Sequence, residues 1–229
     1  MQKASTETCT TELTGLNQVE RKAAPRDLYC RGEGSLLSSV QPRVAIIGSR
    51  NADENELELA YTTARSLAAR GVIIVSGLAR GVDTAAHQGA IDANGKTIAV
   101  LGAGFSHIYP PENKELFQLI GQEHLLLTQF APDKPPLTHN FPMRNRLMAL
   151  IADATAIVTA TETSGTRHQA WEAIRLNRLV LINGALLKRQ ITWMDQLLSY
   201  GAESVALPDG LGQRLEQHGL ISRNDSSAE

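Results

Sequence analysis

The stretch "GVIIVSGLARGVDTAAHQGA", residues 71–90, decides the fold, because it runs from an aliphatic strand through a glycine-rich loop into a helix. Gly77 and Gly81 bracket Arg80 on this loop, so the backbone there can approach a ligand closely. Asp83 or Thr84 is expected to cap the helix that follows. A strand, a loop and a helix in this order are typical of α/β proteins.

The alternation of aliphatic strands and helical segments continues on both sides of this stretch. Strands are predicted at residues 43–48, 71–77, 97–102, 124–130, 155–161, 179–183 and 203–207. Helices are predicted at residues 55–69, 84–93, 112–121, 144–152, 166–176 and 191–200. The strands are continuously apolar, as in strands buried on both faces of a parallel sheet. The sequence therefore predicts an α/β fold with a doubly wound, mostly parallel sheet.

Polar segments flank this alternation at both ends. Residues 1–25 lack periodicity and are expected to form a flexible polar N-terminal arm. Residues 26–210 are expected to form one domain, followed by a short C-terminal tail at residues 211–229.

The composition restricts the possible partners and compartment. The chain has 22 Lys and Arg against 24 Asp and Glu, and this net charge of −2 does not indicate a bulk nucleic-acid or membrane binder, so any anion site must be local. No apolar run approaches the roughly 20 residues of a membrane span, and the first thirty residues lack an apolar signal core. Cys9 and Cys30 could pair, but two cysteines are too few for a disulfide framework, so free thiols and a cytoplasmic location are expected.

Glycine, hydroxyl and arginine residues gather in the loops that follow the predicted strands. Ligands of doubly wound sheets bind beyond the carboxyl ends of the strands, where such loops lead into helix N-termini. Arginine donors and loop amides at one edge favour phosphate, and a loop aromatic can stack on a base. The candidate residues are Gly48, Ser49, Arg50, Gly77, Arg80, Gly81, Phe141, Arg144, Arg146, Ser164, Gly165 and Thr166.

Several of these residues also have a purely structural interpretation. Arg50 could be a surface arginine on a strand-to-helix turn, and Phe141 a hydrophobic staple beside a solvated basic turn. His87, one turn into its helix, is expected to be structural. The loop "LGAGFSHIYPPEN" lacks the third glycine of a dinucleotide-binding fingerprint, so no cofactor is expected.

Four motifs in the same order give the chain a family resemblance. "GSR", "SGLARGVDTAAHQGA", "TIAVLGAGFSHIYPPEN" and "FPMRNRLMA" resemble the motifs of the bacterial DprA/Smf proteins, and "LYCRGEGSLL" is similar to the segment before that family's first strand. The resemblance extends over residues 27–209. It implies a Rossmann-like domain that binds single-stranded DNA, protects it during natural transformation and recombination, and helps to load the RecA recombinase.

The resemblance also implies a site and an assembly. The family's DNA groove surrounds the GSR loop, the SG-ARG loop and the F-P-x-R-N-R segment, which correspond here to Gly48, Ser49, Arg50, Gly77, Arg80, Gly81, Phe141, Arg144 and Arg146. Family members usually form homodimers, and longer relatives add a winged-helix module that is not expected in this chain.

Two departures from the family pattern leave alternatives open. The chain has "SGTRHQA" where the family commonly has S-G-S-L-I-T-A, and "LINGALLKRQITW" where a P-G is usual. The fold is also similar to that of LOG phosphoribohydrolases, whose P-G-G-x-G-T-x-x-E motif places a glutamate near the sugar. Here Arg167, His168 and Gln169 stand in that region and Glu172 is displaced, so an enzyme is not expected. The alternatives are a nucleotide-binding sensor domain and a phosphoribohydrolase-like enzyme.

Overall fold

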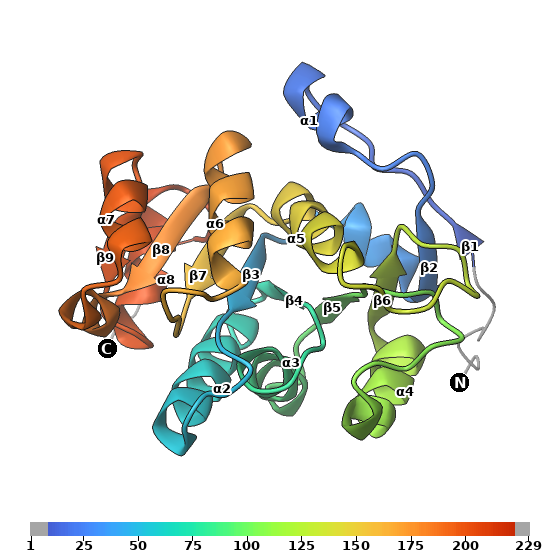
Figure 1. The fold of residues 1–229 in the computed structure, drawn as a ribbon, viewed down its shortest axis with the longest axis horizontal. Helices are drawn as coiled ribbons and strands as arrows, with labels where there is room; N and C mark the ends of the chain where they lie inside the picture. The colour runs from blue at the N-terminus through green and yellow to red at the C-terminus, as the bar shows by residue number, and fades with distance from the viewer. Residues whose placement is uncertain (1–8, 223–229) are drawn as a thin grey trace, which may run out of the picture.

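A computed structural model describes residues 9–222, which form one nine-stranded sheet with helices on both faces (Figure 1). The strands are β1 (Cys9–Thr10), β2 (Tyr29–Gly32), β3 (Arg43–Ile47), β4 (Ile73–Ser76), β5 (Thr97–Val100), β6 (Leu125–Thr128), β7 (Ala154–Ile157), β8 (Leu179–Asn183) and β9 (Glu203–Val205). The α-helices are α1 (Gln18–Ala23), α2 (Glu54–Ala68), α3 (Val82–Asp92), α4 (Lys114–Glu123), α5 (Asn140–Ile151), α6 (Thr166–Arg175), α7 (Thr192–Ser199) and α8 (Asp209–Gln217). Short 3₁₀ helices are η1 (Gly34–Leu37), η2 (Pro111–Asn113) and η3 (Gly184–Arg189).

The sheet order confirms the predicted doubly wound, mostly parallel fold. The order is β1-β2-β6-β5-β4-β3-β7-β8-β9, in which β3 to β9 are parallel and β1 and β2 are antiparallel additions at one edge. From β3 the chain proceeds outward through β4, β5 and β6, and then returns to the other side of β3 with β7. The strand order therefore reverses between β3 and β7, the place where doubly wound sheets bind ligands.

The continuous apolar character of the strands has a direct structural cause. Along β3, Val44 and Ile46 belong to the core on the side of α2, α3 and α8, whereas Ala45 and Ile47 belong to the core under α5, α6 and α7. Side chains alternate between the two faces of a strand, so both sets must be apolar when helices cover both faces.

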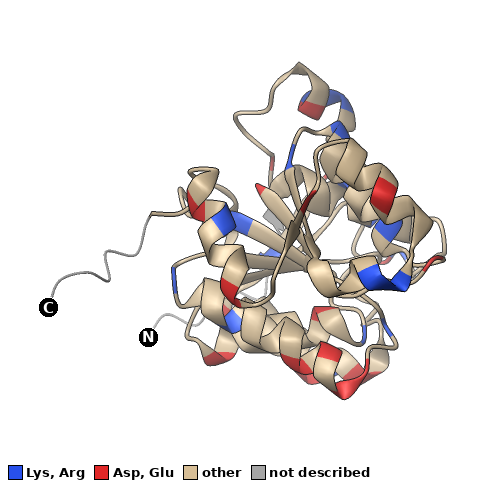
Figure 2. Cartoon of the chain, turned by 90° about the vertical axis from the view of Figure 1, so that its left-hand side faces the viewer, with Lys and Arg blue, Asp and Glu red and all other residues tan. Residues whose placement is uncertain are grey.

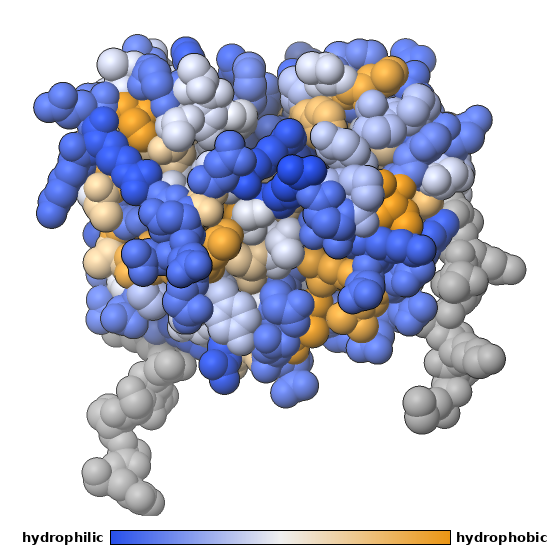
Figure 3. Space-filling view, turned by 60° about the horizontal axis from the view of Figure 1, so that its bottom comes forward, coloured by the Kyte–Doolittle hydropathy of each residue, from blue (hydrophilic) through white to orange (hydrophobic). Residues whose placement is uncertain are grey.

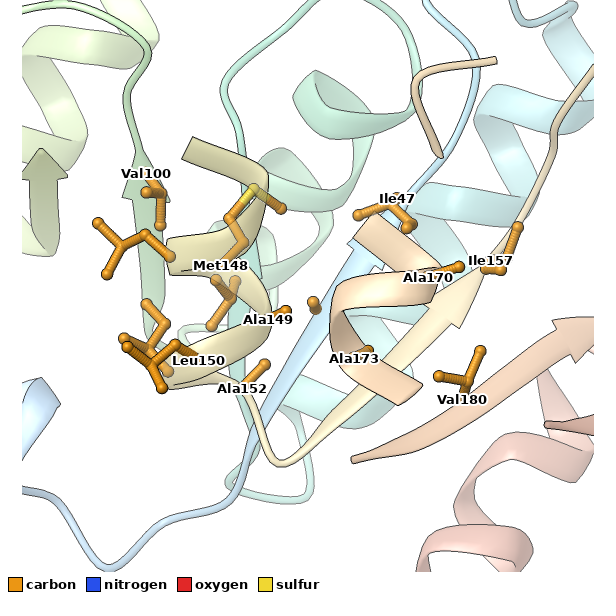
Figure 4. Close-up of a cluster of buried hydrophobic side chains, with 14 of the residues drawn as sticks. Ile47, Val100, Met148, Ala149, Leu150, Ala152, Ile157, Ala170, Ala173 and Val180 are labelled. Atoms are coloured by element: carbon orange, nitrogen blue, oxygen red, sulfur yellow. The ribbon is translucent and has the colours of Figure 1, made fainter. Parts of the chain in front are cut away.

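Small side chains let α5 and α6 lie close together over the sheet (Figure 4). Ala149 on α5 and Ala170 and Ala173 on α6 are fully buried between the two helices and the strands beneath. Met148 and Leu150 fill the space on the β5 side. This packing brings the N-terminal turns of both helices to the carboxyl edge of the sheet.

The N-terminal segment is more ordered than predicted. Residues 1–8 lie outside the described residues, but β1 and α1 fall within the range expected to be a flexible arm. Asn17 and Glu20 form a capping box at the start of α1, and Glu20 forms an ion pair with Arg178 at 2.6 Å. The capping box stabilises α1 itself, and the partly buried ion pair holds the helix to the domain, a long-range contact that a sequence without periodicity could not indicate. At the other end, α8 occupies part of the predicted tail, and residues 223–229 lie outside the described residues.

The prediction of free thiols is wrong for Cys30. This residue is buried and disulfide-bonded, and the register of β1 against β2 places Cys9 opposite it. The signal that was missed is the short β1 strand, whose pairing with β2 is non-local. Because disulfides are rare in reducing compartments, the cysteines no longer support the prediction of a cytoplasmic location.

The surface carries unevenly distributed charge. Acidic residues follow the helices at the bottom of the molecule, where α2 contributes Glu54, Glu56 and Glu58 (Figure 2). The space-filling view from below is mostly hydrophilic, with separate apolar patches (Figure 3). None of the helices within residues 9–222 is both long and apolar enough to cross a membrane.

Candidate functional site

A cavity of about 400 Å³ opens at the strand-order reversal between β3 and β7. Its walls come from the loops after β3, β4 and β7 and from the N-terminal turns of α5 and α6. The lining includes Gly48, Ser49, Arg50, Asp83, Phe141, Arg144, Asn145, Thr161, Ser164, Gly165, Thr166, His168 and Gln169. Residues far apart in sequence thus meet at the edge where the loop pattern predicts a ligand site.

Close packing explains the glycines of the two loops on one side of the cavity. A Cβ on Gly48 would lie 2.5 Å from Val82 Cγ2, and a Cβ on Gly81 would lie 2.4 Å from the carbonyl oxygen of Ser49. Gly81 has a φ of 76°, and Leu78 between the loop glycines has a φ of 56°. The loops after β3 and β4 therefore contact each other through their backbones, in conformations that favour glycine. Gly81, with no side-chain cap, is also the N-cap of α3, so the prediction of an Asp83 or Thr84 cap is wrong.

Arg144 lies beneath these loops rather than on the surface. Its side chain is 6% exposed, its Nη1 donates to the carbonyl oxygen of Val100 at 3.2 Å, and its Nε donates to Asn145 Oδ1 at 2.9 Å. The carboxylate of Asp83 lies 4.0 Å from Nη1. Burial raises the pKa of Asp83, and the nearby Arg144 guanidinium opposes that rise. The pair is a buried charge cluster in the floor of the cavity, which the surface-turn interpretation of Arg144 did not foresee.

Gly77 makes room for the Arg144 guanidinium. A Cβ on Gly77 would lie 1.4 Å from Arg144 Nη1. We expect Gly77→Ala to displace this side chain and to lower the free energy of unfolding by about 1–3 kcal/mol, the range for overpacking a filled interior. Urea unfolding measures the loss, with Gly165→Ala as the control, because no atom lies within 4 Å of a Cβ at that position. Equal midpoints for Gly77→Ala and Gly165→Ala would contradict this account of the loop.

An aromatic and an arginine lie side by side at the rim of the cavity. Phe141 lies in the first turn of α5, which begins at Asn140, earlier than predicted. The exposed Arg50 places its guanidinium carbon 5.2 Å from the Phe141 ring centroid, and Tyr109 places its ring 5.7 Å from the same ring. Phe141 is only partly buried and rests on the backbone of Gly102, so one part of its ring remains accessible. A cation beside a partly exposed aromatic can hold a phosphate while the ring stacks on a base.

The start of α6 supplies hydroxyls to the third wall. Ser164 Oγ donates to Thr166 Oγ1 at 2.6 Å and accepts from the Thr166 amide at 3.2 Å. Asn145 Nδ2 donates to the carbonyl oxygen of Gly165 at 3.4 Å, which links the start of α6 to α5. The positive end of the α6 dipole therefore faces the cavity together with two hydroxyls, a combination that favours an anion.

The predicted site residues do not all meet in this cavity. Gly77 lies in a small adjoining hollow together with Arg50, Phe141 and Arg144. Arg80 and Gly81 line a different groove beside α2 and α3, where Arg80 forms an ion pair with Glu112. Arg146 points away from the cavity lining and pairs with Glu172 at 3.2 Å. The remaining eight of the twelve predicted residues line the main cavity.

The comparison with known proteins agrees with this geometry. Residues 12–216 match the protein family described as DNA recombination-mediator protein A. The chain belongs to this family. It is 30% identical over 197 residues to the DNA processing protein DprA of Bacillus subtilis, covering 86% of this chain and 66% of the relative. It is 36% identical over 183 residues to DprA of Streptococcus pneumoniae, covering 80% of this chain and 64% of the relative. The chain thus spans about two thirds of the length of these DprA proteins.

Solved DprA structures share the fold. The X-ray structure of Streptococcus pneumoniae DprA superposes with a TM-score of 0.77 and 31% identity, over 94% of this chain and 74% of that one. A Helicobacter pylori DprA structure, described by its single-stranded DNA binding mode, gives a TM-score of 0.71 and 28% identity, over 86% of this chain and 98% of that one. A molybdenum cofactor carrier protein of Chlamydomonas reinhardtii shares the fold alone, at 22% identity and a TM-score of 0.53.

Sequence reasoning missed several residues around the DprA-family cavity. Asn145 stands inside the quoted motif "FPMRNRLMA", but only the fold shows that it joins Arg144 to the start of α6. Tyr109 comes from the loop after β5, and its closeness to Phe141 needs the tertiary structure. By contrast, the structural interpretation of His87 is confirmed, because this side chain is fully buried and bonded to Thr97 at 2.7 Å.

Proposed function

We propose that this protein binds single-stranded DNA in the cavity at the carboxyl edge of its sheet. The observation that carries the proposal is the meeting of Arg50, Phe141 and the hydroxyl-rich start of α6 in one open cavity. An exposed guanidinium and a helix N-terminus suit phosphates, and an accessible phenyl ring suits an unstacked base. These contacts do not read base edges, so binding is expected to be sequence-tolerant and salt-sensitive.

The family supports the wider biological proposal. The Helicobacter pylori relative is described as a single-stranded DNA binder. From the family resemblance we further propose that the protein acts in the cytoplasm as a homodimer, which protects incoming strands and delivers them to RecA in natural transformation and recombination. The acidic residues of α2 do not line the main cavity, which carries Arg50 and Arg144 in its lining.

The cavity favours a binding protein over a phosphoribohydrolase. Gln169 stands where the hydrolase motif requires a glutamate, and its side chain is buried against α5. Glu172 is held by Arg146 and by Arg175, the latter at 2.8 Å, and does not line the cavity. Within residues 9–222, no group of three or more His, Cys, Asp or Glu side chains is arranged to hold a metal ion. The position of the hydrolase glutamate thus holds an uncharged amide in this chain.

We expect Arg50→Gln to weaken binding of labelled oligo-dT and to flatten its dependence on salt. Loss of one phosphate contact reduces the slope of log K against log[salt] by about 0.7 for a single strand. Fluorescence anisotropy over about 50–200 mM salt measures both quantities. Arg214→Gln is the control, because Arg214 pairs with Glu203 at 3.0 Å, at the start of β9 and away from the strand ends. An Arg50 variant with the affinity and slope of the wild type would remove this arginine from the site.

A further inference from the structure

We propose that the bound strand continues past the main cavity to Arg189, which supplies a second phosphate subsite in the loop after β8. The inference rests on the proposed function and concerns the path of the strand. It assigns a role to η3, a segment that the candidate site does not include.

The strand order defines a row of loops at the carboxyl edge of the sheet. Within the order β5-β4-β3-β7-β8, Tyr109 follows β5, Arg50 follows β3, Thr161 follows β7 and Arg189 follows β8. Carboxyl ends of parallel strands lie at one edge, so the strand ends that lead into these residues form a line in that order. Four steps of about 4.8 Å give the line a length of about 19 Å. A strand of several nucleotides, rather than one nucleotide, fits a site of this length.

A second hollow joins the main cavity at its β7 side. It has a volume of about 540 Å³ and is lined by residues 160–162 and 189–192. Thr161 lines both this hollow and the main cavity, so the two spaces are neighbours at that residue. A strand that leaves the Arg50 side of the main cavity over Thr161 therefore enters the hollow beside Arg189.

Arg189 is fixed in place with part of its guanidinium still available. Its Nη2 lies 2.7 Å from Glu56 Oε1, and its Nη1 donates to Thr159 Oγ1 at 3.4 Å. The side chain is nevertheless 48% exposed, and a guanidinium has five N–H donors. The ion pair holds the side chain in one orientation before any phosphate arrives, which lowers the entropy lost on binding.

The carboxylates near Arg189 are already occupied by protein donors. Glu56 Oε1 also accepts from Thr159 Oγ1 at 2.8 Å, and Glu56 Oε2 accepts from the Asp53 amide at 3.1 Å. Glu162, on the wall of the second hollow, accepts from the amide and the hydroxyl of Thr192 at 3.0 and 2.5 Å. These bonds point the carboxylate oxygens at protein donors. Glu162 remains exposed, and Arg189 is the cation that lines this hollow.

The test compares variants over a series of oligo-dT lengths from about 4 to about 16 nucleotides, by anisotropy at low salt. Arg189→Gln should bind the longest strands about three- to tenfold more weakly than the wild type, as expected for the net contribution of one solvent-exposed hydrogen-bonded contact. It should bind the shortest strands as the wild type does, because these do not reach the second hollow. Arg50→Gln should lose affinity at every length. Arg214→Gln is the matched control, an ion-paired and partly exposed arginine at the opposite edge of the sheet. Thermal unfolding checks that all variants are folded.

The possible outcomes separate the inference from the proposed function. If Arg189→Gln and Arg214→Gln bind alike at all lengths while Arg50→Gln loses affinity, the second subsite is wrong and the main cavity stands. If Arg189→Gln loses affinity equally at all lengths, Arg189 belongs to the first contact and the extended path is wrong. Absence of any binding by the wild type overturns both proposals.

Discussion

Arg144→Met is expected to lower the free energy of unfolding by about 3–5 kcal/mol, the largest effect of any substitution in the site. Arg144 is 5% exposed, and its guanidinium faces Asp83 and the carbonyl oxygen of Val100. Removing it leaves the Asp83 carboxylate buried without its cation and Val100 without a donor. The unpaired Asp83 carboxylate is then buried without the attraction of Arg144. The loss of stability is far larger than the net contribution of the intact pair, because in the wild type that attraction offsets the desolvation of both partners.

Urea unfolding of three variants tests this explanation. Arg144→Met alone should be the least stable, and the double variant Arg144→Met with Asp83→Asn should recover part of the loss, because no unpaired carboxylate remains. Burial already raises the pKa of Asp83. The difference in free energy of unfolding between the wild type and Arg144→Met should therefore be larger at pH 8 than at pH 5, where the carboxyl group can take up a proton. If Arg144→Met unfolds at the urea midpoint of the wild type, the buried pair does not hold this site together.

The second large effect is loss of stability in acid through His87. This side chain is fully buried, and burial lowers its pKa from 6.5 to about 3, with smaller contributions from His124 and Arg144. Thr97 Oγ1 donates to the carbonyl oxygen of Ile74, so His87 Nδ1 must donate to Thr97 Oγ1. The second proton would have to go on Nε2, which is buried and has no hydrogen-bond partner. The folded state therefore keeps His87 neutral where the unfolded chain protonates it.

The direction and size of the pH effect follow from this difference. Above pH 6.5 the residue is neutral in both states and contributes nothing. As the pH falls from 6.5 toward 3, only the unfolded chain gains the proton, so stability is lost. At about 1.4 kcal/mol per pKa unit the full loss is about 5 kcal/mol, of which about 2 kcal/mol falls between pH 7 and pH 5.

A comparison of slopes isolates the contribution of His87. Between pH 7 and pH 5, His87→Gln should lose about 2 kcal/mol less stability than the wild type, whatever its stability at pH 7. His218→Gln is the control, because His218 is 40% exposed and pairs with Glu203 at the protein surface. If plots of the free energy of unfolding against pH are parallel for the wild type and His87→Gln, this histidine is not held neutral in the folded state.

The sheet was predictable because its signal is local. The parallel strands from β3 to β8 are predominantly apolar, and both faces of β3 are covered, as the sequence pattern predicts. The N-terminal additions were not predictable in this way. β1 pairs with β2, and α1 is held by the ion pair of Glu20 with Arg178, which follows it by more than 150 residues. Such contacts depend on the folded domain and leave no periodic pattern in the sequence.

The site was predictable at the level of loops but not of side-chain directions. The loop positions predicted that Arg50, Phe141 and Thr166 would converge, and they line one cavity. Arg80 and Arg146, from the same motifs, turn to Glu112 and Glu172 instead. Spacing along a loop or helix determines where the backbone of a residue lies. The direction of its side chain depends on partners from elements later in the chain, which the spacing does not reveal.

The most direct test of the central claim is a titration of the wild-type protein with labelled oligo-dT, at two salt concentrations and with competitors. If the cavity takes a single strand, binding should weaken as salt rises, unlabelled oligo-dT should compete, and duplex DNA and mononucleotides should compete poorly. Absence of strand binding, together with thermal stabilisation by a mononucleotide, would contradict the account and make the cavity a nucleotide site.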